Sequence, residues 1–147
     1  MLHPHVGTMV ETRSDVDRVL AGSQIKLCLD TGHLLIGGTD PLQLAREVPG
    51  RIAHAHLKDV DASLAARVQT GELTYTEAVA DGMYTPLGGG DVDIAGIVTA
   101  LRSNGFDGRF VMEQDTILDG EPTDEGPVRE VRLSVAYMTD VCRSVPV

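Results

Sequence analysis

The sequence contains no tryptophan, and phenylalanine and tyrosine bring its aromatic content to only 3%. Aliphatic side chains must therefore form the core of this chain, whose 147 residues are enough for one domain. Cysteine is also scarce. Cys28 and Cys142 lie far apart in unrelated settings, which excludes a disulfide-rich scaffold and predicts two reduced thiols.

Long apolar runs and an excess of basic residues are missing as well. No apolar run is long enough to span a bilayer, and no signal-peptide pattern precedes the first expected strand. The 12 lysine and arginine residues stand against 22 acidic ones, and the net charge of −10 disfavours nucleic acid and anionic membranes as partners. We therefore predict a cytoplasmic protein that acts on a small molecule.

Apolar runs separated by turn residues predict four strands, each followed by helical sequence. Strands are expected at the start of the chain and at 25–30, 51–57 and 108–113, and helices at 15–22, 41–48, 62–70, 74–80, 94–103 and 130–143. We expect Gly22 to end the first helix in the left-handed conformation, and residues 82–91 to form a loop. The alternation predicts an α/β fold with a parallel sheet, either half of an eight-unit barrel or a small open sheet.

The stretch from Leu27 to His33 is the centre of this pattern, because an apolar run ends there in an acid, a small turn and a histidine. Asp30 falls at the carboxyl end of the expected strand, and Gly32 allows the backbone to turn after it. Side chains at this end lie where α/β folds keep their chemistry. The alternative is a turn in which Asp30 only bonds its own backbone.

All five histidines fall at or near expected strand ends. The four strands end on His5, Asp30, His56 and Glu113 at equivalent depths. This would bring two imidazoles and two carboxylates together at the carboxyl ends of the strands, the mouth of the expected barrel. Mixed nitrogen and oxygen ligands suit a divalent cation. We predict Mn²⁺ or Co²⁺, with Mg²⁺ or Zn²⁺ as alternatives; the lack of thiolates argues against a structural zinc site.

Five motifs along the chain carry a family resemblance. They are HPHVGTMVET at 3–12, LDTGH at 29–33, HAHLKD at 54–59, EAVADG at 77–82 with YTPLG at 84–88, and FVME at 110–113. With them the chain resembles the C-terminal half of the xylose isomerase-like TIM-barrel superfamily of sugar isomerases, epimerases and dehydratases, and most of all its inosose dehydratases. The resemblance implies one domain over residues 1–147, a partial (β/α)8 barrel of about four β-α units.

The resemblance also implies a ligand set. It assigns a metal ion to Asp30, His56 and Glu113. The family's fourth ligand is usually a glutamate, but a histidine stands at that position here. We predict His5 as this ligand, with His3 as the other candidate.

The remaining implied roles concern the substrate. His33 and Glu11 match positions that contact substrate oxygens, and Lys58 shares the inward face with His56. Lys58 or Glu113 would remove the proton next to the ketone of a keto-cyclitol such as 2-keto-myo-inositol, and His33 would assist the loss of water. Reprotonation instead of elimination would make the protein a sugar or hydroxypyruvate isomerase or epimerase.

The resemblance covers only four of eight barrel units, and an exposed half-barrel invites pairing with another chain. We expect a homodimer or a complex with a separate N-terminal half. The third alternative is a non-catalytic barrel remnant.

Overall fold

The computed structural model describes residues 1–118, 120–121 and 125–145, and these form strands backed by helices. The strands are β1 (Leu27–Asp30), β2 (Ile52–Leu57), β3 (Asp59–Val60), β4 (Tyr84–Thr85) and β5 (Phe110–Met112). The helices are α1 (Arg13–Gly22), α2 (Thr31–Ile36), α3 (Pro41–Glu47), the 3₁₀ turn η1 (Pro49–Arg51), α4 (Ala62–Gln69), α5 (Tyr75–Ala80), α6 (Ile94–Ser103) and α7 (Pro127–Ser144).

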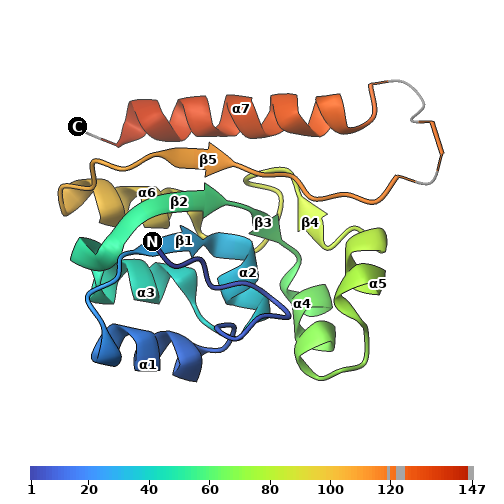
Figure 1. Cartoon of the computed structure of the whole chain (residues 1–147). Coiled ribbons are helices and arrows are strands. Elements are labelled where there is room, and N and C mark those ends of the chain that lie inside the picture. The colour runs from blue at the N-terminus through green and yellow to red at the C-terminus, as the bar shows by residue number, and fades with distance from the viewer. Residues whose placement is uncertain (119, 122–124, 146–147) are drawn as a thin grey trace.

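The main sheet is parallel and has the strand order β1-β2-β5 (Figure 1). A single parallel bridge between Leu2 and Leu27 adds the N-terminal segment beside β1. Helices α1, α3, α6 and α7 follow the four successive strand positions in the same order (Figure 1). The predicted parallel α/β fold of about four β-α units is therefore confirmed.

The two faces of the sheet differ because side chains alternate along each strand. Leu27 and Leu29 are fully buried in the aliphatic core, as are Ile97 and Leu101 of α6. Cys28 and Asp30 point to the other face, where β1 pairs them with His54 and His56 of β2. The apolar face holds the helices, and the polar face carries the candidate site.

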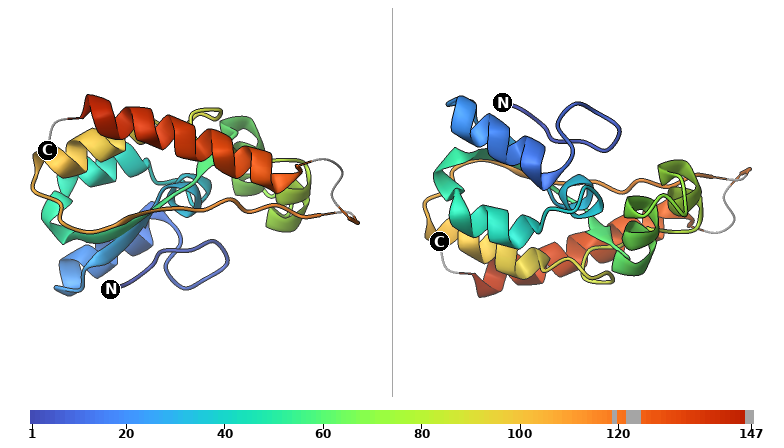
Figure 2. Two further views of the ribbon diagram at one scale, coloured as in Figure 1. Left: turned by 90° about the horizontal axis from the view of Figure 1, so that it is seen from above. Right: turned by 90° about the horizontal axis from the view of Figure 1, so that it is seen from below.

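The helices cover one side of the strands in sequence. Helix α7 lies alongside α6 in both views of Figure 2, whereas α1 and the N-terminal segment lie at the opposite edge of the strands. Helix α3 packs against α6, and α2 packs against α4. None of the helices in the described part of the chain combines the length and the apolar character needed to cross a membrane.

Several predicted elements differ in detail from the observed ones. The expected opening strand is reduced to one bridge, and the loop at 82–91 contains the short β4, which pairs antiparallel with β3. Gly22 does not adopt the left-handed conformation: Ser23 caps α1 with extended backbone. Helix α2 was not predicted, because its six residues are too few for apolar periodicity to be recognised.

A buried aspartate fixes the glycine-rich loop between β4 and α6. The carboxylate of Asp59 accepts hydrogen bonds from the backbone N–H groups of Gly88, Gly90 and Val92 at 2.8, 3.1 and 3.0 Å, and from that of Val60 at 3.0 Å. Asp59 is only 1% exposed. The glycine-rich loop is thereby attached to the sheet directly after Lys58.

Candidate metal centre

Four polar side chains meet at the carboxyl ends of the four parallel segments. Asp30 is the last residue of β1, and the strand register pairs it with His56 of β2. Glu113 follows β5, where its backbone N–H donates to the Leu57 carbonyl at 3.0 Å. His3 follows the bridge residue Leu2. The parallel register therefore brings side chains from four separate sequence segments to one mouth.

Asp30 lies at the centre of these contacts. Its Oδ2 atom lies 3.1 Å from His3 Nε2, 3.1 Å from Lys58 Nζ and 3.4 Å from His56 Nδ1. Its Oδ1 atom accepts from the backbone N–H of His33 at 2.9 Å and so caps α2. Burial opposes ionisation, but the His3 hydrogen bond and the Lys58 charge outweigh it and hold the pKa of Asp30 well below its usual range. Asp30 thus caps α2 through one oxygen and presents the other, ionised, at the mouth.

Lys58 is a buried ammonium held by three carboxylates. Its Nζ atom lies 2.7 Å from Glu113 Oε2, 3.1 Å from Asp30 Oδ2 and 3.4 Å from Asp115 Oδ2. Burial disfavours the charge, but Asp30 and Glu113 more than compensate and raise the pKa of Lys58 above its ordinary value. Thr31 fixes the backbone here, since its hydroxyl donates to the Lys58 carbonyl and accepts from the Lys58 N–H. Lys58 is therefore a protonated side chain in contact with these carboxylates.

His33 and His5 form a stacked pair beside this cluster. Their ring centroids lie 3.5 Å apart, and His33 Nε2 lies 3.2 Å from Lys58 Nζ. Burial lowers the pKa of His33 to about 3, so its imidazole is neutral. His5 Nδ1 donates to the Val6 carbonyl at 2.8 Å. The stacking thus positions His5 against His33 rather than toward the carboxylates.

Ligand atoms converge in three groups among the described residues. One consists of Asp30, His56 and Glu113, a second of His3, Asp30 and His33, and a third of His3, Cys28 and His56. The first is the trio that the resemblance assigns to the metal. His3, the alternative for the fourth ligand, belongs to two of the groups, whereas the preferred candidate His5 belongs to none of them.

The surroundings of His56 Nδ1 indicate whether these residues suit a cation. The atom is buried and lies 3.2 Å from Glu113 Oε1 and 3.4 Å from Asp30 Oδ2, yet it makes no hydrogen bond among the described residues. The distances are those of an ion pair, but the hydrogen-bond geometry is poor. A lone pair facing two carboxylate oxygens can share a divalent cation with them, so the residues fit a metal ion.

Glu11, another predicted site residue, lies outside the convergent groups. The carboxylate of Glu11 accepts from the Gly7 N–H at 2.9 Å in the N-terminal loop. Glu11 therefore shapes the loop that carries the first two histidines.

The two cysteines are both free, and burial raises the pKa of the Cys28 thiol to about 12.

Sequence reasoning missed several residues that surround the cluster. Tyr75 and Tyr84 join their hydroxyls at 3.0 Å, and the Tyr75 ring lies 6.1 Å from the His33 ring. Tyr75 and Asp115 line one pocket, and Asp115 links it to Lys58. The YTPLG motif contained Tyr84, and two-residue periodicity along β1 places Cys28 on the face of Asp30.

Comparison with known proteins gives the same fold and a consistent set of relatives. Inosose dehydratase of Geobacillus thermodenitrificans (strain NG80-2) is 31% identical over 143 residues, which cover 95% of this chain and 47% of the relative. The rhizopine catabolism protein MocC of Rhizobium meliloti is 36% identical over 115 residues, which cover 77% of this chain and 35% of that relative. The chain thus spans about half or less of the length of the curated relatives it matches.

Solved structures share this architecture at low sequence identity. The probable 3-DHS dehydratase AsbF of Bacillus anthracis aligns with a TM-score of 0.59 and 20% identity over 93% of this chain and 48% of that one. A D-tagatose 3-epimerase-like protein aligns with a TM-score of 0.60 and 16% identity over 99% of this chain and 48% of that one. A family model for the xylose isomerase-like TIM barrel matches residues 1–136. The chain therefore belongs to the xylose isomerase-like TIM barrel family.

Proposed function

We propose that this chain carries the metal-binding and proton-transfer residues of a dehydratase that removes water from a keto-cyclitol of the 2-keto-myo-inositol type. The observation that carries the proposal is the contact of 2.7 Å between Lys58 Nζ and Glu113 Oε2, directly beside Asp30 and His56. It joins a proton donor and a proton acceptor at the edge of a cation site. The sequence similarity to inosose dehydratases supports this substrate class.

The residues that would hold the cation are Asp30, His56 and Glu113, with His3 as the fourth ligand. His3 is preferred to His5 because His3 Nε2 already contacts Asp30, whereas His5 Nδ1 is bonded to Val6. Mn²⁺ or Co²⁺ matches this mixture of imidazoles and carboxylates. When bound, such a cation polarises the ketone and stabilises the negative charge that develops on its oxygen.

The proton transfers of a dehydration can be assigned to this chain's side chains. Glu113 takes the proton from the carbon next to the ketone, and Lys58 gives a proton to the β-hydroxyl, whose C–O bond breaks to release water. The electron pair of the broken C–H bond becomes the new carbon–carbon double bond. Because Glu113 Oε2 and Lys58 Nζ are in contact, the abstracted proton can return to Lys58 for the next turnover. His33, adjacent to Lys58, orients a substrate hydroxyl.

We expect Lys58→Met to lower turnover of 2-keto-myo-inositol about 100-fold or more while Mn²⁺ still binds, since the loss of a positioned acid costs about 10²–10⁴-fold. The reaction is followed by the absorbance of the unsaturated product, and metal binding by calorimetry. Lys26→Met is the matched control, because Lys26 is the only other lysine and bonds the Gly50 carbonyl away from the cluster.

The same assay with ketoses and hydroxypyruvate separates the alternatives. Turnover of these substrates but not of the keto-cyclitol would favour an isomerase or epimerase. Unchanged keto-cyclitol turnover in Lys58→Met would contradict the assigned acid. The barrel first has to be completed by a second polypeptide, as proposed in the next paragraph. If the completed barrel turns over none of these substrates, the chain is a non-catalytic remnant.

We propose further that a second polypeptide completes the barrel, as a second copy of this chain or as a separate N-terminal half. Two observations support this proposal. The chain covers only 48% of the length of each of the two solved barrels, and the strands at the two ends of its sheet are the second observation. β5 ends the sheet, and Met112 on it is 41% exposed. The exposed apolar residues of α7 are Val128, Val131, Leu133 and Val135.

Sedimentation velocity of the purified chain tests this completion. We expect a dimer at micromolar concentration, with Met112→Glu shifting it toward the monomer because a charge would be buried at the strand edge. The control is Met9→Glu, since Met9 is 95% exposed in the N-terminal loop. A monomer that also fails to bind the co-expressed N-terminal half of an inosose dehydratase would contradict the proposal.

A further inference from the structure

A thiol lies on the same face of the sheet as the candidate metal ligands. Cys28 precedes Asp30 by two residues on β1, so its side chain points to the same side, about 7 Å nearer the amino end of the strand. It is 2% exposed and free of any disulfide. The dehydration proposed above gives this thiol no task.

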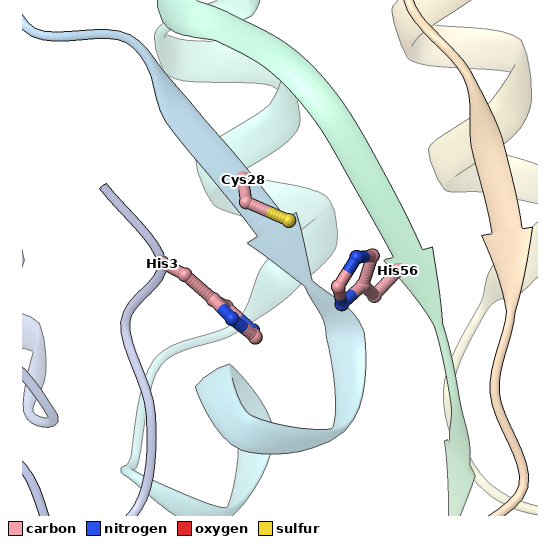
Figure 3. A group of neighbouring side chains, drawn as sticks. All are labelled: His3, Cys28 and His56. Atoms are coloured by element: carbon pink, nitrogen blue, oxygen red, sulfur yellow. The ribbon is translucent and has the colours of Figure 1, made fainter. Parts of the chain in front are cut away.

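Two imidazoles flank the thiol. Figure 3 shows the sulfur of Cys28 directed to the side of the sheet where His3 and His56 lie, with one histidine on each neighbouring segment. One ligand atom from each of the three residues lies within 4.8 Å of the other two. The rings of His3 and His56 are 4.9 Å apart and edge-to-face. The three donors therefore surround one small volume.

Backbone pairing holds the three residues in place. The Cys28 N–H donates to the Leu2 carbonyl at 2.7 Å, which fixes the segment that carries His3. The parallel ladder of β1 and β2 fixes His56 on the other side. His3 and His56 side chains keep 34% and 20% exposure, so an ion can reach them from the mouth. The donor set is thus preorganised and accessible.

We propose that His3, Cys28 and His56 form a second cation position that takes a thiophilic divalent metal, Zn²⁺ or Cd²⁺. One thiolate with two imidazoles is a soft donor set, whereas Mn²⁺ and Mg²⁺ prefer carboxylate oxygens. Binding breaks the S–H bond of Cys28, forms a sulfur–metal bond and releases the proton to solvent. The assignment does not rest on the proposed dehydration, which does not use the thiol.

The two cation positions exclude each other. His56 belongs to both the thiol group and the Asp30–His56–Glu113 group, and His3 contacts Asp30. Two divalent cations held by the same imidazole within this small volume would also repel each other. Binding of Zn²⁺ or Cd²⁺ therefore displaces Mn²⁺, and the metal available to the chain decides whether its oxygen-rich site is filled.

The test is a Cd²⁺ titration of the full chain, followed by the ultraviolet absorption of a thiolate–cadmium bond. Wild type and Cys142→Ser are expected to develop the same band, because the second variant keeps Cys28 as its only thiol. Cys28→Ser is expected to lose the band and still bind Mn²⁺. With Mn²⁺ bound first, Cd²⁺ is expected to release it from wild type, as measured by the electron paramagnetic resonance of the free ion.

Each of these results supports or contradicts the proposed cation position. No band in Cys142→Ser, or a band that persists in Cys28→Ser, would overturn the thiol as a ligand. A band without release of Mn²⁺ would overturn the exclusion. If Cys28→Ser fails to fold, Cys142→Ser still answers the question, since any thiolate–cadmium bond in it must involve Cys28. Loss of the band in His3→Ala, with His54→Ala unchanged, would support the assigned imidazole.

Discussion

Asp30→Asn is expected to weaken Mn²⁺ binding by more than about 100-fold, beyond the 10–100-fold that the loss of a residue supporting a metal ligand costs. Asp30 supplies the buried carboxylate on which His3 and Lys58 converge, with His56 alongside. An amide is uncharged and directs N–H groups where the cation needs an acceptor. Isothermal titration calorimetry with Mn²⁺ measures the loss directly.

The fold is expected to survive this substitution. Asparagine keeps an oxygen that can accept from the His33 N–H and cap α2. Lys58 loses one counter-charge but keeps Glu113 and Asp115, so we expect the free energy of unfolding to fall by about 1–3 kcal/mol rather than by the cost of an unpaired buried charge. Circular dichroism and urea unfolding check both points.

Asp40→Asn is the matched control, because Asp40 caps α3 through the backbone N–H groups of Leu42 and Gln43 and takes no part in the cluster. It should leave Mn²⁺ affinity unchanged. Full metal occupancy in Asp30→Asn would mean that the cation, if bound, lies elsewhere in the chain.

Asp59→Ala is expected to lower the free energy of unfolding by about 3–5 kcal/mol, because four backbone N–H groups lose a charged acceptor at once. Three of these groups belong to Gly88, Gly90 and Val92 in the loop before α6. The site is tightly packed: a Cβ atom at Gly90 would lie 2.5 Å from the Asp59 Oδ1 atom. Urea unfolding of the variant gives the change.

The control lies two residues away. Asp61 is half-buried and caps α4 through the backbone N–H groups of Ser63 and Leu64. Its replacement by alanine should cost about 1 kcal/mol, the usual effect of removing a helix cap. Equal losses for Asp59→Ala and Asp61→Ala would show that the glycine-rich loop does not depend on the buried carboxylate.

The sequence predicted the sheet and the convergence of Asp30, His56 and Glu113, because both depend on local patterns. Apolar runs indicated β1 and β2, and the positions of Asp30 and His56 near the carboxyl ends of these runs predicted that the two residues would be neighbours. In a parallel pair, residues at the same depth along the two strands lie side by side, so Asp30 and His56, 26 positions apart, could be placed together without a structure.

Choices that depend on irregular backbone could not be predicted in the same way. His3 and His5 alternate as strand residues would, but the segment pairs through Leu2 alone, so periodicity could not decide which histidine faces Asp30. Asp59 gave no sign of its role either. Its partners lie about 30 residues later in a loop, and Lys58 and Asp59, adjacent in sequence, could also have formed an ordinary surface ion pair.

The strand order also sets the sequence of events during folding. β1 and β2 are close in the chain and can pair early, whereas β5 must close a loop of more than 50 residues before Ala55 meets Phe110. Glu113 arrives with that last strand. We therefore expect His3, Cys28 and His56 to come together before Glu113 joins them, so that a thiophilic ion present during folding would meet its donors first.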